Sequence, residues 1–147
     1  MMGIARADLD AVFERAPGVA ERVRGDDADA IVASARAALE RMTEAERIAV
    51  LNAHPRIGAA ADSLSASSRR EQGGDTGNAT LQRLRHLNDE YERRFGFRFV
   101  AFVHGRSKAE MIPLLEERLR RARAQELATG IDEFLEIAHD RLLGMQR

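Results

Sequence analysis

The chain has 147 residues, 44% hydrophobic and 32% charged, which is typical of one folded globular domain with a charged surface and excludes a disordered chain. The 23 basic and 24 acidic residues nearly cancel, which argues against a nucleic-acid partner. The absence of cysteine excludes disulfides, thiolate metal sites and cysteine nucleophiles. No apolar run approaches the ~20 residues that cross a bilayer, and no targeting signal is visible. We therefore expect a cytoplasmic single domain over residues 1–147 with no membrane partner.

Helix-forming residues dominate the first third of the chain, and strand-like alternation is rare. We expect a helix over residues 7–15, ended by the approaching Pro17, and a short helical segment over residues 19–23. Asp27 is then expected to cap a helix that runs to Met42. A capping box, Thr43 with Glu46, opens the next helix, which brings His54 and Pro55 to its end.

Residues 58–80 are rich in Ala, Ser and Gly and predict a loop with one short helix near residues 68–72. The clearest helix covers residues 79–95, where an apolar stripe is followed by Gly96 as a left-handed cap. Residues 97–103 predict an extended segment through the core. Ser107 is expected to cap a helix that runs to about residue 123, with Pro113 tolerated only in the first turns, and a final helix is expected over residues 124–143. The fold class is thus all-α, a bundle of about seven or eight helices.

The four histidines lack the i, i+4 spacing of a helical metal pair, so we expect no metal site. His54 differs from the others because it lies at a helix end fixed by Pro55. A helix C-terminus favours the cationic form of histidine, so His54 is a candidate for proton exchange near neutral pH. The alternative is a histidine that merely bonds a free carbonyl at the helix end.

Three further features allow two interpretations each. Ser68, Glu71 and Gln72 form an S-x-x-E-Q pattern, which is either a capping box or a helix start that faces an anionic ligand. The extended segment is either core or a backbone platform for a planar ligand. Most arginines, such as those of LEERLRRAR (residues 115–123), are expected on solvated helix faces, and no spacing rule singles out Arg141.

Taken in order, five motifs resemble the decarboxylases of 2-oxo-4-hydroxy-4-carboxy-5-ureidoimidazoline (OHCU), enzymes of urate degradation. The motifs cover the chain from about residue 5 to residue 143. They are His54-Pro55, the S-x-x-E-Q stretch at residues 68–72, LNDEYERRFGFRFV at residues 87–100, Gln125-Glu126-Leu127 and Arg141-Leu142. The chain departs from many members by reading HPRIG where they read HPDLAG.

The resemblance implies an all-helical, cofactor-free homodimer that converts OHCU, a small ureide, to (S)-allantoin and CO2. It assigns catalysis to His54, Glu71 and Arg141. Substrate contacts are implied for Pro55, Ser68, Arg69, Arg70, Gln72, Phe99, Val100, Ala101, Phe102 and Val103.

In the implied mechanism, His54 handles the proton and Glu71 orients its ring. Arg141 and the backbone N–H groups of residues 99–103 hold ring oxygens and developing negative charge.

Two alternative functions stay open. One is a non-catalytic helical module that binds a ligand or a partner protein, and the other is a lyase or hydrolase acting on a related ureide.

Overall fold

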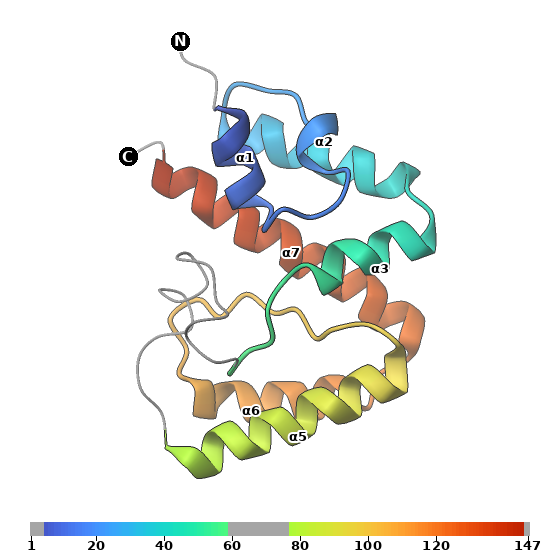
Figure 1. Ribbon diagram of the computed structural model, residues 1–147, viewed down its shortest axis with the longest axis vertical. Coiled ribbons are helices and arrows are strands. Elements are labelled where there is room, and N and C mark those ends of the chain that lie inside the picture. Colours follow the sequence, from blue (N-terminus) through green and yellow to red (C-terminus); the bar gives the residue numbers. More distant parts are fainter. Residues whose placement is uncertain (1–4, 59–76, 146–147) are drawn as a thin grey trace.

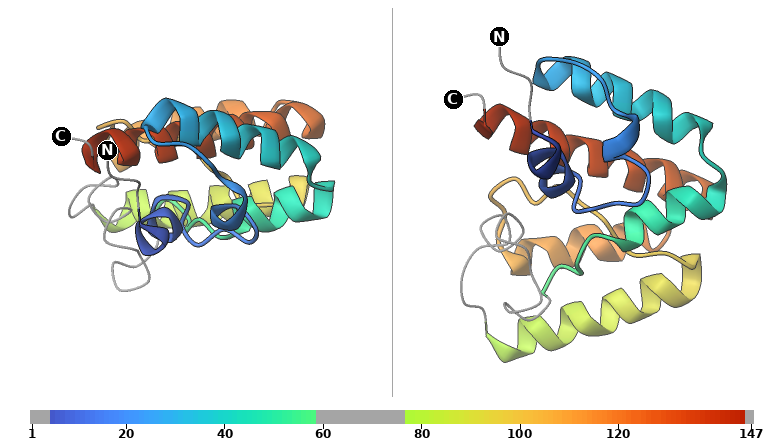
Figure 2. Two further views of the ribbon diagram at one scale, coloured as in Figure 1. Left: turned by 90° about the horizontal axis from the view of Figure 1, so that it is seen from above. Right: turned by 45° about the horizontal axis from the view of Figure 1, so that its top comes forward.

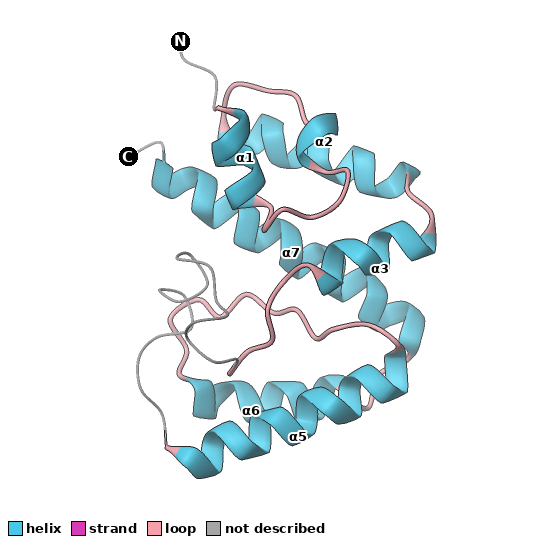
Figure 3. Cartoon of the chain, viewed as in Figure 1, coloured by secondary structure: helices cyan, strands magenta, loops and turns pink. Residues whose placement is uncertain are grey.

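The structure is a computed structural model, and it describes residues 5–58 and 77–145. These residues hold six α-helices and one 3-10 helix, against the seven or eight helices expected for the whole chain, and no strand (Figure 3). The all-α class is therefore confirmed. The short helix expected near residues 68–72 lies outside the described residues. Within the described ranges, no helix has the length and apolar character needed to span a bilayer.

Capping patterns locate several helix starts correctly. α2 (Ala28–Arg41) is capped by Asp27, whose side chain accepts a hydrogen bond from the Ala30 N–H at 2.8 Å. Thr43 and Glu46 form the predicted capping box of α3 (Glu44–Asn52). Ser107 forms a second capping box, with Glu110, at α6 (Lys108–Arg118), and Pro113 lies in its second turn. These side chains satisfy N–H groups that the first helical turn leaves unbonded.

The remaining helices follow their apolar stripes. α5 (Asn78–Phe95) ends at Gly96, which has the predicted left-handed conformation with φ of 82°. α7 (Arg123–Met145) is the longest helix and buries residues along most of its length. A 3-10 helix (Ala20–Arg22) stands where the short helical segment was expected.

Two helices end earlier than predicted. α1 (Arg6–Val12) stops three residues before the predicted end, because Glu14 and Arg15 adopt positive φ values of 53° and 55°. α6 ends at Arg118, not near residue 123. A tight turn follows it, and the Gln125 side chain accepts a hydrogen bond from the Ala122 N–H at 3.2 Å, which starts α7.

The helices form two layers: α2, α6 and α7 lie in one, and α1, α3 and α5 in the other (Figure 2). α5 and α6 lie side by side, and α7 packs against α1, α2 and α3 (Figure 1). Residues 98–103 form the predicted extended segment, which connects α5 to α6 and crosses the molecule between this pair of helices and α3 and α7 (Figure 1). Its side chains are buried except for those of Arg98 and Phe102, which are half-buried. The core therefore lies between the layers, around this segment.

Candidate functional site

His54 lies just beyond the end of α3, and its side chain is buried, with 5% exposure. Its backbone N–H donates to the Leu51 carbonyl at 3.1 Å, and its own carbonyl accepts a hydrogen bond from Arg98 Nη1 at 2.9 Å. The ring lies edge-on to Phe134 of α7, with 5.2 Å between centroids. Neither ring nitrogen has a hydrogen-bond partner among the described residues. The alternative of a histidine bonded to a helix-end carbonyl through its ring is therefore wrong.

The pKa of His54 is lowered to about 4, first by burial and then by the positive charge of Arg141, while the negative charge of Glu14 opposes both. The expectation of a favoured cationic form is thus wrong. The reason is that removal of water from the ring costs more than the partial charge of a short helix end returns. At neutral pH the imidazole is neutral and can accept a proton.

Arg141 lies on α7, two turns beyond Phe134, and is also buried, with 8% exposure. Its Nη1 donates to the carbonyls of Ala11 and Val12 at 3.2 and 3.1 Å, and its Nη2 lies 3.3 Å from Glu14 Oε1. Arg141 therefore binds the end of α1 and places a charge near His54. The structure brings these two predicted residues together.

Glu14 is a site residue that the sequence analysis missed. Its side chain is 10% exposed, and its charge acts on both Arg141 and His54. No pattern in the sequence marks it, because its position depends on the left-handed backbone after α1 and on a partner 127 residues away.

The extended segment carries the backbone N–H groups for which a role in substrate binding was predicted. Its start is tied to the end of α3, since the Arg98 N–H donates to Asn52 Oδ1 at 2.9 Å. The Phe102 N–H donates to Glu133 Oε1 at 3.2 Å, so this group is occupied. Within the described residues, the N–H groups of Phe99, Val100, Ala101 and Val103 have no acceptor. These four N–H groups leave the platform interpretation open.

Five predicted site residues, Ser68, Arg69, Arg70, Glu71 and Gln72, lie outside the described residues, and Pro55 is half-buried beside His54. The predicted partnership of Glu71 with His54 therefore stays a prediction. No group of three or more His, Asp or Glu side chains suited to a metal ion occurs in the described part of the chain.

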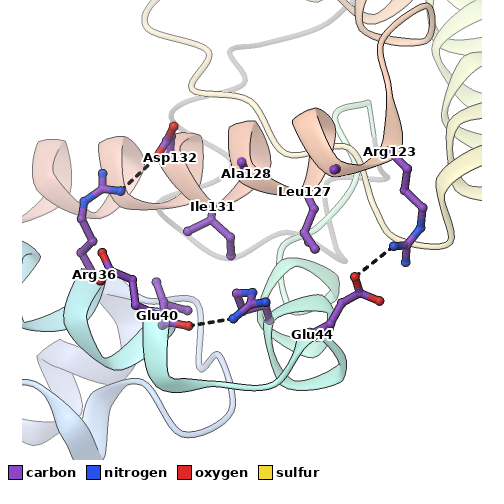
Figure 4. Close-up of a pocket in the computed structure, with 11 residues that line it drawn as sticks. Arg36, Glu40, Glu44, Arg123, Leu127, Ala128, Ile131 and Asp132 are labelled. Atoms are coloured by element: carbon purple, nitrogen blue, oxygen red, sulfur yellow. Dashed lines mark hydrogen bonds and ion pairs between the residues drawn. The ribbon is translucent and has the colours of Figure 1, made fainter.

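Two surface grooves lie elsewhere. One of about 630 Å³ lies between α2, α3 and α7, with Leu127 and Ile131 on its floor (Figure 4). Ion pairs cross its rim, Arg36 with Asp132 at 3.0 Å and Arg123 with Glu44 at 3.1 Å. A second, of about 720 Å³, lies beside Phe102 and His104. Neither groove is lined by His54, so we place the candidate site at His54 on the chemistry of its buried polar groups and not at these grooves.

Curated relatives carry consistent names. A protein of Haloferax volcanii named 2-oxo-4-hydroxy-4-carboxy-5-ureidoimidazoline decarboxylase is 28% identical over 138 residues, 89% of this chain and 82% of the relative. A Bos taurus protein of the same name is 35% identical over 103 residues, which cover 65% of this chain and 61% of that protein. A uric acid degradation bifunctional protein of a Bacillus species is 26% identical, and the match spans 28% of its length.

The fold also has solved counterparts. A crystal structure described as OHCU decarboxylase in the presence of (S)-allantoin superposes with a TM-score of 0.75 at 24% identity and covers 94% of this chain and 96% of that one. A crystal structure of (S)-allantoin synthase gives a TM-score of 0.71 at 22% identity, over 95% of this chain and 48% of that chain. At these identities the likeness concerns the fold alone. The family model for OHCU decarboxylase matches residues 4–143, nearly the whole chain, and the chain belongs to the OHCU decarboxylase family.

Proposed function

We propose that this protein is a carboxy-lyase that converts OHCU to (S)-allantoin and CO2 in urate degradation, with His54 as the group that moves the proton. The observation that carries the proposal is a buried, neutral histidine whose two ring nitrogens have no described partner, next to the buried cation of Arg141. Unpaired polar groups are costly in a protein interior, and they concentrate at functional sites. The family membership supplies the substrate.

The substrate carries a carboxylate and a hydroxyl on the same ring carbon. When the bond to the carboxylate carbon breaks, CO2 leaves and the electron pair passes into the ring, where a ring nitrogen takes a proton from solvent. The hydroxyl loses its proton as its carbon becomes a carbonyl, and the neighbouring ring carbon gains one. A neutral His54 suits both transfers, since it can accept the hydroxyl proton and then deliver a proton to one face of the ring.

Arg141 supplies the electrostatic part of the mechanism. A fixed cation near the histidine attracts the anionic substrate and stabilises the charge that develops as CO2 leaves. The bound carboxylate would in turn offset the effect of Arg141 on His54 and raise the pKa of the imidazole toward the working range.

The proposed site is completed by Glu71 and the rest of the stretch Ser68 to Gln72, by Pro55 and by the backbone of residues 99–103. We further propose that the protein is cytoplasmic and forms a homodimer. The exposed Leu143 and Met145 at the end of α7 support the dimer.

The test is replacement of His54 with alanine, using OHCU made freshly from urate with urate oxidase and hydroxyisourate hydrolase. We expect kcat to fall by about 10²–10⁴-fold, the usual contribution of general acid–base catalysis, and we would follow the circular dichroism of allantoin. His139→Ala is the matched control, because His139 is on α7 and bonds Asp29 on the surface. Far-UV dichroism checks the fold of both variants. Wild-type turnover in a folded His54→Ala protein would refute the role of His54.

A non-catalytic module is the competing function. It predicts binding of allantoin or a related ureide without any acceleration of OHCU loss in the wild type, which the same assay measures. A lyase or hydrolase for another ureide would instead turn over that compound and leave OHCU to its slow, racemic decay.

A further inference from the structure

A buried ionic network joins α5, α6 and α7 and contacts the extended segment. Arg118 of α6 donates through Nε to Glu126 Oε1 of α7 at 2.7 Å, and the hydroxyl of Tyr91 of α5 donates to the same oxygen at 2.6 Å. The side chains of Arg118 and Glu126 are 4% and 0% exposed, and Tyr91 is fully buried. The expectation of a solvated helix face for Arg118 is therefore wrong. The Arg118 guanidinium can be buried because the carboxylate of Glu126 offsets its charge.

Arg118 also holds the extended segment directly. Its Nη1 donates to the carbonyl of Val100 at 2.9 Å, and its guanidinium carbon lies 4.6 Å from the centroid of the Phe99 ring. One rigid, planar group thus fixes two consecutive residues of the segment while Glu126 fixes the group itself. The peptide planes on either side of Val100 carry N–H groups that have no acceptor among the described residues.

The network is not arranged for stability alone. Arg118 Nη2 is buried and has no hydrogen-bond partner within the described residues, which is a cost that an apolar side chain at this position would avoid. Buried ion pairs of this kind add little net stability over apolar packing of the same volume, because desolvation of both charges offsets their attraction. What an apolar side chain would not provide is a fixed position for the Val100 carbonyl.

We propose that Arg118 is a positioning residue, which acts through Phe99 and Val100 to set the backbone of residues 99–103 against the substrate. The identity of that substrate rests on the proposed function. The N–H groups of this segment can bind the ring oxygens of a ureide only if the peptide planes keep a fixed orientation, and the Arg118 bond to Val100 fixes one of them.

Arg121 provides a matched control on the same carboxylate. Its Nη1 donates to Glu126 Oε2 at 3.1 Å and to Thr129 Oγ1 at 3.0 Å, and its side chain is 37% exposed. It makes no hydrogen bond to the segment. Replacement of Arg121 therefore weakens the network without releasing Val100. Arg118→Lys keeps a positive charge beside Glu126 but loses the N–H group that donates to the Val100 carbonyl.

The experiment compares Arg118→Lys and Arg121→Lys with the wild type, each at a temperature where its thermal unfolding curve shows a fully folded protein. We expect kcat/KM for OHCU to fall at least tenfold in Arg118→Lys, chiefly through a higher KM, and to change less than twofold in Arg121→Lys. Amide hydrogen exchange of Ala101 and Val103, measured by NMR, should be faster in Arg118→Lys alone. A merely structural role would affect both variants alike.

Wild-type kinetics and exchange in a folded Arg118→Lys protein, or equal losses in both variants, would overturn the proposal. If Arg118→Lys does not fold, the double variant Arg118→Met with Glu126→Gln removes both charges and gives the same comparison. If the wild type fails to turn over OHCU, the proposed function fails, and the exchange rates of Ala101 and Val103 still decide whether Arg118 fixes the segment.

Discussion

The buried imidazole of His54 links the chemistry of the site to the stability of the protein. Its pKa is lowered from 6.5 to about 4 in the folded state by burial and by Arg141. The unfolded chain therefore binds more protons between pH 6.5 and pH 4, and the free energy of unfolding falls as the pH drops through this window. The loss from this residue should be about 3 kcal/mol, which urea unfolding at pH 7.5, 5.5 and 4.5 would measure.

The carboxylates of the chain titrate in part of the same window, so the difference between two proteins isolates the histidine. His54→Gln has no titrating group at this position and should lose less stability between pH 7.5 and pH 4.5 than the wild type. His139→Gln is the control, because it removes a histidine on the surface and shows what loss of an imidazole outside the site does to stability. Parallel pH profiles for His54→Gln and the wild type would contradict the lowered pKa.

Single residues were predictable from the sequence only where a local pattern marked them. His54 stood out because Pro55 follows it at a helix end. Its pKa depends first on burial and then on Arg141 and Glu14, and no local pattern in the sequence shows any of these. Arg118 looked like any arginine of a charged helix. Its burial depends on Glu126, Tyr91 and Val100, which reach it only when α5, α6 and α7 have packed.

Helices were predicted well where their ends are determined by neighbouring residues. The capping boxes at Thr43 and Ser107 and the left-handed Gly96 each satisfy backbone groups within a few residues. The end of α1 was mispredicted because Glu14 and Arg15 turn the chain with positive φ values. The carbonyls of Ala11 and Val12 at this end bind Arg141, which lies at the other end of the chain. Helix ends that are satisfied by tertiary contacts leave no signal in the local sequence.

α3 and α7 pack so closely at Gly130 that the addition of one methyl group there tests how tight their contact is. A Cβ atom at Gly130 of α7 would lie 3.0 Å from Cδ1 of Leu51, a fully buried residue in the last turn of α3, three residues before His54. Better helix propensity would contribute about 1 kcal/mol, but overpacking costs roughly 1–3 kcal/mol. We expect Gly130→Ala to lower the free energy of unfolding by about 1 kcal/mol, measured by urea unfolding, and to slow turnover because the end of α3 shifts.

Gly144 on the same helix gives the control. A Cβ atom there meets nothing within 4 Å among the described residues, so Gly144→Ala should leave turnover unchanged and stabilise the protein by up to about 1 kcal/mol. A Gly130→Ala protein that is as stable as Gly144→Ala would show that Leu51 can move aside and that α3 and α7 are less tightly packed than the structure indicates.

Across the whole molecule, the segment that follows His54 is joined to α5 by polar contacts. Arg56 Nε donates to Glu92 Oε2 at 2.7 Å and Arg56 Nη2 to Asp89 Oδ1 at 2.8 Å, while Asn88 Nδ2 donates to the Ile57 carbonyl at 3.1 Å. These contacts give a structural reason for the HPRIG sequence, in which Arg56 replaces the acidic residue of HPDLAG. The carboxylate partners of Arg56 lie on α5, within the motif at residues 87–100. The segment after His54 and this motif, whose bonded residues are 31 to 36 positions apart in the sequence, therefore contact each other directly.

A double-mutant cycle measures how strongly this contact couples the two parts of the molecule. The side chains of Arg56 and Glu92 are 28% and 29% exposed, so solvent screens the pair only in part. We expect Arg56→Met and Glu92→Gln to show a coupling energy of about 1 kcal/mol in urea unfolding, and added salt should reduce it. Arg83 and Glu116, an exposed pair between α5 and α6 at 2.8 Å, should couple by a few tenths of a kcal/mol at most. If the two pairs couple equally, Arg56 is an ordinary surface ion pair. If only the Arg56 pair couples, and its loss also raises KM for OHCU, then the ion pair between Arg56 and Glu92 helps to hold His54 in place.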